Sequence, residues 1–171
     1  MKMTARCTLS LGAWRAWEAY CTVSCIFCDI VAERAPASFV YRDDQVSAFM
    51  TLRPTAPGEC LVIPNAHIDD FTDVPQALAA HIVTIAQRIG RRMRTTFPLQ
   101  RVGYLVHGYG VAHAHFIIVP QQGPHHLTSD RFAHIVDGHV VFDQGRVATT
   151  ARDVLDNHAR QLAQTGLPSE P

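Results

Sequence analysis

The sequence predicts a single α+β domain with a mainly antiparallel sheet, and three observations support this. Short apolar runs bounded by turn residues fill the first third of the chain, one amphipathic helix follows, and two further strand-like runs come after it. No repeat or linker divides the chain, and 171 residues with 47% hydrophobic residues can bury one core. We expect the domain over residues 25–164, an N-terminal extension without a firm pattern at 1–24, and a flexible tail at 165–171.

The first three strands are expected before the helix. Residues 39–41 and 46–50 are apolar runs separated by four polar residues, as in a β-hairpin. Residues 51–58 contain two prolines and a glycine and predict a loop, which leads into a third strand over 59–63.

One long helix is expected over residues 75–94. Its apolar residues recur every three or four positions, at Leu78, Ile82, Ile85, Ile89 and Met93. The stripe they form could exceed what one thin sheet covers.

The remaining elements follow the helix. Residues 101–107 and 111–119 predict two strands joined by a tight turn at Gly108-Tyr109-Gly110. A hairpin is expected over 139–148, and a short C-terminal helix through Leu155 and Leu162.

Charge and composition exclude several classes of function. Fifteen basic and fifteen acidic residues give a formal net charge of zero, which argues against nucleic acid or a membrane surface as a partner. Any phosphate must therefore be bound by local groups. No apolar run is long enough to span a bilayer and no clean signal-peptide cleavage site follows the N-terminus, so we expect a cytoplasmic protein.

The five cysteines include one Cys-x-x-Cys motif, Cys25 and Cys28. In a reducing compartment this pair could bind a metal, act as a redox pair or be inert. The other three, Cys7, Cys21 and Cys60, are expected to be free thiols.

Two histidines stand two residues apart in the apolar run 111–119. In a strand, His113 and His115 would project from the same face. Because burying an imidazole without a partner costs about 1–3 kcal/mol, each should have a ligand, a hydrogen-bond acceptor or a substrate in reach. The alternative is a pair of satisfied histidines in the core or at its rim.

Spacing along the chain favours a zinc site. A tetrahedral site needs four nitrogen or sulfur ligands, and Cys-x-x-Cys supplies two of them. Histidines near strand ends can complete the set, so the candidate ligands are Cys25, Cys28, His67 and His113.

If His113 binds the metal, His115 is free to react. A neutral imidazole is a good nucleophile toward phosphorus, and the backbone N–H groups of Gly108-Tyr109-Gly110 could meet the charge on the phosphoryl oxygens. His107 lies beside this turn and could reach the phosphate, or could be an exposed turn residue. His125 and His126 are expected in a solvated loop.

The chain resembles the histidine-triad (HIT) family of nucleotide hydrolases and transferases. The resemblance is carried by residues 25–33, 40–44 and 48–49, then by 53–58, 61–64 with His67, and the histidine motif through Pro120. It implies a five-stranded antiparallel sheet with one long helix, and a homodimer formed through that helix and an edge strand.

The resemblance also implies roles for individual residues. His115 stands at the family's nucleophile, the middle histidine of His-x-His-x-His, and the four candidate ligands match those of zinc-containing members, where the zinc is structural. The base and ribose pocket would be formed by Ile26, Phe27, Ile30, Phe49 and Leu61.

Four positions depart from the family pattern. Ile117 replaces the third histidine, so this chain reads His-x-His-x-Ile and lacks a donor there. Thr51 stands where many members have a ribose-binding aspartate, Glu59 where several have a histidine, and Gly110 where a serine or threonine often contacts phosphate.

These features predict a phosphoryl-transfer enzyme that hydrolyses a nucleoside phosphate or phosphoramidate-type bond through a nucleotidyl-histidine intermediate. The alternatives are a nucleotidyl transferase and a catalytically weak HIT protein that binds nucleotide as a regulator.

Overall fold

A five-stranded antiparallel sheet forms the centre of the molecule, in the order β1-β2-β3-β5-β4. The computed structural model describes residues 25–124, 126, 133–142 and 147–163. The strands of the sheet are β1 (Phe39–Arg42), β2 (Val46–Met50), β3 (Cys60–Pro64), β4 (Arg101–Val106) and β5 (Phe116–Gln121). The predicted extension 1–24 and tail 165–171 lie outside the described residues.

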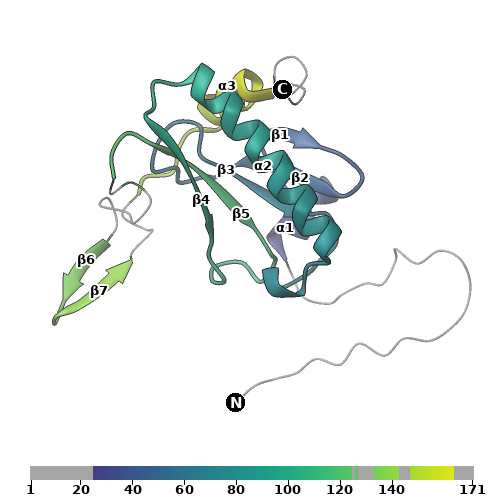
Figure 1. Cartoon of the computed structure of the whole chain (residues 1–171), viewed down its shortest axis with the longest axis horizontal. Coiled ribbons are helices and arrows are strands. Elements are labelled where there is room, and N and C mark those ends of the chain that lie inside the picture. The colour runs from purple at the N-terminus through teal and green to yellow at the C-terminus, as the bar shows by residue number, and fades with distance from the viewer. Residues whose placement is uncertain (1–24, 125, 127–132, 143–146, 164–171) are drawn as a thin grey trace, which may run out of the picture.

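Helix α2 (Gln76–Thr96) lies across one face of the sheet, as Figure 1 shows. The predicted apolar stripe meets the sheet: Ile82, Ile85, Ile89 and Met93 are fully buried in the main core, whereas Leu78 packs at its margin. The chain's own sheet therefore covers this stripe. No helix among the described residues is long and apolar enough to cross a membrane.

Helix α3 (Arg152–Ala163) packs against α2 and β1. Leu155 and Leu162 are fully buried there, which confirms the predicted C-terminal helix. Asp156 of α3 accepts a hydrogen bond from Ser38 at 2.6 Å, and this bond joins α3 to the segment before β1.

The β1–β2 turn is fastened to α2 by a single carboxylate. The main-chain N–H groups of Gln45 and Val46 and the Tyr41 hydroxyl donate to Asp43 at 2.7–2.8 Å, and His81 Nε2 of α2 lies 2.7 Å from the same carboxylate. Burial alone would raise the pKa of Asp43, but these hydrogen bonds outweigh it and hold the pKa at about 2.

Two elements differ from the prediction. Helix α1 (Ile26–Val31) was not expected, because a helix of fewer than two turns is too short to show a helical period. The predicted hairpin over 139–148 is wrong: β7 (His139–Phe142) pairs instead with β6 (Ala133–Val136).

The turn chemistry explains this second difference. Asp137 and Gly138 both have positive φ, 49° and 79°, as the favoured two-residue hairpin turns require. The Asp-Gly pair therefore sets the register, and Figure 1 shows this hairpin standing apart from the main sheet.

Candidate active site and metal centre

The two motif histidines lie in a loop before β5. The strand begins only at Phe116, so the prediction that His113 and His115 sit within a strand joined by a tight turn is wrong. The connection from β4 covers residues 107–115, where Gly110 has a φ of 103°. Loop residue Ala114 donates its N–H to the Ile68 carbonyl at 2.6 Å, which fastens the loop to the segment after β3.

The structure brings together the four side chains proposed as metal ligands. The donor atoms of Cys25, Cys28, His67 and His113 all lie within 4.8 Å of one another. Cys25 immediately precedes α1 and Cys28 lies in its first turn, a spacing that puts the two thiols on one side of the helix. His67 follows β3 and His113 comes from the motif loop, so three separate parts of the chain meet here.

The distances between these donors suit Zn²⁺. Tetrahedral zinc with bonds of about 2.0–2.3 Å places its nitrogen and sulfur ligands about 3.3–3.8 Å apart. His113 Nδ1 lies 3.5 Å from Cys25 Sγ and 3.7 Å from Cys28 Sγ, and His67 Nδ1 lies 3.2 Å from Cys28 Sγ. The donor set and its spacing both fit a structural zinc.

The environment of His113 prepares its ring for metal binding. The ring is fully buried, and its Nε2 donates a hydrogen bond to the Pro64 carbonyl at 2.9 Å. That bond leaves the lone pair on Nδ1, the atom that faces the two sulfurs. Burial lowers the pKa of His113 and so favours the neutral imidazole that a metal requires.

His115 is also held in one tautomer. Its Nδ1 donates to the main-chain carbonyl of His113 at 2.8 Å, so the lone pair is on Nε2. The ring is half-buried, and its centroid lies 5.7 Å from that of Phe27, edge to face. In its neutral form His115 thus carries its lone pair on Nε2, the atom not engaged by the His113 carbonyl.

Four of the five apolar candidates for the base pocket lie in one cluster beside the histidines. Phe27, Ile30 and Phe49 are buried in a second core cluster, on the face of the sheet opposite α2. Leu61 is partly exposed next to this cluster, and Ile26 is 50% exposed. Leu61 therefore offers accessible apolar surface supported by the three buried residues, and Ile26 is an exposed residue of α1.

The other candidate substrate-binding residues lie outside the apolar cluster. Thr51 is half-buried, and its main chain donates to the Glu59 carbonyl at 3.2 Å. His107, Gly108 and Gly110 are exposed in the motif loop, as the phosphate-binding prediction requires.

Glu59 is buried, which no pattern in the sequence indicated. Its carboxylate accepts hydrogen bonds from the Thr55 N–H at 2.6 Å and from the Thr55 hydroxyl, and thereby closes the loop between β2 and β3. Burial raises the pKa of Glu59.

The sequence also did not indicate that Pro64 accepts the hydrogen bond from the His113 ring. Pro64 acts through its main-chain carbonyl, which any residue would supply.

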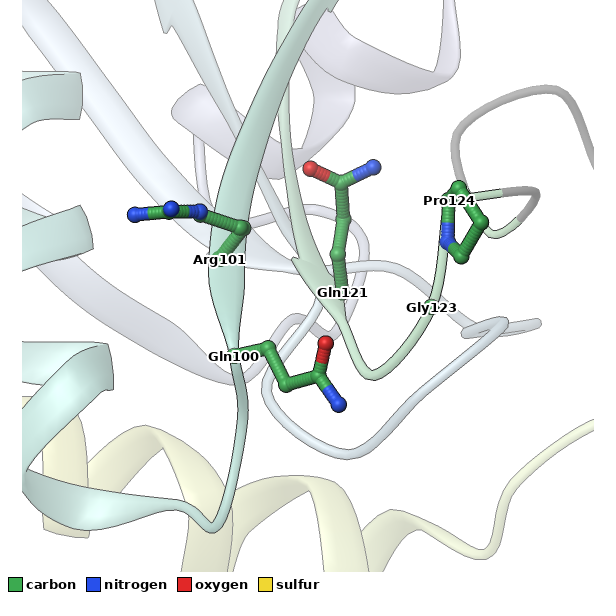
Figure 2. Close-up of a pocket in the computed structure, with 5 residues that line it drawn as sticks. All are labelled: Gln100, Arg101, Gln121, Gly123 and Pro124. Carbon is green, nitrogen blue, oxygen red and sulfur yellow. The ribbon is translucent and has the colours of Figure 1, made fainter.

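A cavity of about 220 Å³ lies at the opposite end of β4 and β5. Figure 2 shows the side chains of Gln100, Gln121 and Pro124 around it, while that of Arg101 points away. Arg101 pairs with Gln121, five residue pairs from the Val106–Phe116 pair next to the motif loop. At about 3.4 Å per residue this is about 17 Å away, so the cavity is separate from the histidine site.

The comparisons with known proteins decide the family. The HIT domain model matches residues 32–129, which is more than half of the chain. The chain belongs to the HIT family. This confirms the resemblance that the motifs indicate, and the solved HIT structures confirm the α+β fold.

Individual relatives of this HIT protein add detail. An uncharacterised HIT-like protein of Mycobacterium tuberculosis is 43% identical over 72 residues, covering 42% of this chain and 50% of the relative. The chain thus spans half the length of that relative. Adenosine 5'-monophosphoramidase of Saccharomyces cerevisiae is 32% identical over 101 residues, covering 58% of this chain and 63% of the enzyme.

One solved relative bears on the metal centre. A zinc-bound histidine-triad protein of Mycobacterium smegmatis is 26% identical with a TM-score of 0.62, and the match covers 82% of this chain and 91% of that protein. The HIT fold of the present chain is therefore shared with a zinc-containing structure.

Proposed function

We propose that this HIT protein hydrolyses a nucleoside phosphate or phosphoramidate-type bond through a nucleotidyl intermediate on His115. The observation that carries this proposal is the 2.8 Å hydrogen bond from His115 Nδ1 to the His113 carbonyl, since it leaves Nε2 free to attack. The yeast phosphoramidase among the relatives supports the same class of reaction.

The first step is attack by His115 Nε2 on the α-phosphorus. The bond from phosphorus to the leaving group breaks, and the nucleotidyl group is transferred to the imidazole. Backbone N–H groups of the exposed segment from Gly108 to Gly110 meet the charge on the phosphoryl oxygens. Water then attacks the same phosphorus, which releases the nucleoside monophosphate and frees His115.

The nucleoside is held by the apolar surface beside the histidines. Ile26 and Leu61 contact the base, and Phe27, Ile30 and Phe49 support them from the second core cluster. Thr51, half-buried at the end of β2, offers a hydroxyl to the ribose.

Cys25, Cys28, His67 and His113 hold a structural zinc. When bound, Zn²⁺ fixes α1, the segment after β3 and the motif loop to one point and takes no part in the reaction. The spacing of the four donors and the zinc-bound relative both support this role.

A nucleotidyl transferase is the second candidate. Ile117 pairs with Leu61 on one side and Leu105 on the other, so the surface beside the nucleophile is apolar. Such a surface favours an acceptor other than water in the second step.

We also propose that the protein works as a homodimer in the cytoplasm.

Turnover of a panel of nucleoside phosphates and phosphoramidates by the wild type and His115→Asn tests these proposals. We expect turnover by the wild type, loss in the variant, and a nucleotidyl adduct on His115 by mass spectrometry after acid quench. Turnover only with an added acceptor would identify a transferase. Nucleotide binding without turnover in either protein would refute the enzyme and leave a regulatory nucleotide-binding protein.

A further inference from the structure

Hydrolysis of a phosphoramidate needs an acid as well as a nucleophile. The leaving nitrogen is a poor leaving group unless it gains a proton as the bond to phosphorus breaks. His115 donates its Nδ1 proton to the His113 carbonyl, so that proton is already engaged. A second group must supply the proton, and this argument rests on the function proposed above.

The nearest row of the sheet offers no proton. Ile117 is paired with Leu61 of β3 and Leu105 of β4, so these three side chains lie in one row on the same face. All three are partly exposed, and their face is the one opposite α2, which also carries Phe27 and His115. An aliphatic side chain can neither donate nor accept a proton.

The end of the β4–β5 ladder brings one histidine close to the nucleophile. Val106 of β4 and Phe116 of β5 form the last pair of this ladder. His107 directly follows Val106 and His115 directly precedes Phe116, so the two histidines stand at the two ends of the connecting loop, one residue beyond the same pair. This position allows nucleophile and acid to approach a bound phosphate from the two arms of the loop.

The surroundings of His107 leave its ring available. The residue is exposed, and within the part of the chain that the structure describes its ring contacts Tyr109, at a centroid distance of 5.9 Å. Two other histidines near the site are engaged, because His67 and His113 face the two cysteines.

We propose that His107 is the general acid that protonates the leaving group. The lone pair of His115 Nε2 forms the new bond to phosphorus, and the electrons of the breaking P–N bond stay on nitrogen. Protonated His107 gives that nitrogen its proton, and the leaving group departs as a neutral amine. In the second step water displaces His115 from phosphorus and loses a proton to solvent, and the exposed His107 regains its proton from solvent, which restores both histidines.

His107→Gln tests this role, because glutamine keeps a polar side chain but cannot deliver a proton. Two adenosine substrates are compared: the 5'-phosphoramidate of an alkylamine, and the 5'-(p-nitrophenyl phosphate), whose leaving group departs as a phenolate without a proton. We expect the kcat of the variant on the phosphoramidate to fall by about 10²–10⁴ while KM changes little. Its kcat on the nitrophenyl ester should stay near the wild-type value.

His139→Gln is the matched control, because His139 is an exposed histidine of the separate β6–β7 hairpin. It should hydrolyse both substrates as the wild type does. Suppose that the wild type hydrolyses both substrates. If His107→Gln then slows both reactions equally, or slows neither of them, the acid role is refuted while the proposed function stands. If the wild type hydrolyses neither, the proposed function fails and the role of His107 fails with it.

Discussion

Ile117 is the residue that separates this chain most clearly from the His-x-His-x-His pattern. Its neighbours across the sheet, Leu61 and Leu105, are also aliphatic, so the change extends beyond one position. Thr51, Glu59 and Gly110 differ from the pattern too. We propose that the site has been rebuilt around a different leaving group rather than damaged.

Ile117→His tests this interpretation. The new imidazole would enter an apolar row, so we expect no large gain in hydrolysis of a simple nucleoside phosphoramidate and a loss of activity toward the natural substrate. A correctly positioned general acid raises the rate of such a reaction by a factor of about 10²–10⁴. A gain of that size in steady-state kinetics would show that the third histidine had simply been lost.

The sequence predicted the side chains of the site better than the bonds that orient them. Cys25, Cys28, His67 and His113 follow from residue type and spacing, and the structure brings them together. The acceptors for both motif histidines are main-chain carbonyls, of Pro64 and His113. Main-chain atoms are the same in every residue, so no pattern of side chains could indicate them.

Among the secondary-structure elements, the sheet and the long helix were predicted closely and the connections were not. The strand pattern from Val111 to Val119 suggested a continuous strand, but the structure places residues 107–115 in a loop. Val111 is the one β-branched residue of this loop, whereas Ile117, Ile118 and Val119 lie in β5 itself, so the strand pattern was extended too far toward the N-terminus.

Asp43 joins the β1–β2 turn to α2, and its low pKa predicts sensitivity to acid. Its folded-state pKa of about 2 lies below the reference value of about 3.9. Ionised Asp43 therefore stabilises the fold above pH 4, and this contribution is lost as the pH falls toward 2. We expect Asp43→Asn to lower the free energy of unfolding at pH 7 by on the order of 2 kcal/mol.

Urea unfolding at several pH values measures this effect. The wild type should lose stability between about pH 4 and 2, and the variant should lose less over that range. Asp44→Asn is the control, because Asp44 is the exposed neighbour in the same turn. Equal pH dependence in wild type and Asp43→Asn would contradict the assignment.

For the whole molecule, the metal centre predicts a dependence of stability on zinc. We expect one zinc per chain by elemental analysis of protein purified without added metal, and a lower Tm after chelation. Structural zinc contributes apparent binding energies of about 10 kcal/mol or more in small zinc domains. Cys28→Ser should lose the metal, whereas Cys60→Ala, in the main core, should keep it. Well under one zinc per chain, without cysteine oxidation, would count against the site.

Dimer formation is the second prediction for the whole molecule. The helical stripe is buried against the chain's own sheet, so it does not itself call for a partner. Exposed apolar residues lie at the β4 edge of the sheet, where Tyr104 and Val106 are 40% and 42% exposed, and on α2, where Val83 is 47% exposed. Sedimentation at micromolar concentration should show twice the 18.9 kDa chain mass. Val106→Lys should shift it toward monomer, and a wild type that sediments only as monomer would rule the dimer out.

His113 makes two contacts through two chemically different groups. Its ring nitrogen faces the cysteines, and its main-chain carbonyl accepts a hydrogen bond from His115. Only the ring is encoded by the identity of residue 113. A change of that residue could remove a zinc ligand, yet the oxygen that sets the tautomer of His115 would still be part of the polypeptide. The orientation of His115 therefore depends on the path of the backbone, whereas the proposed metal depends on the identity of residue 113.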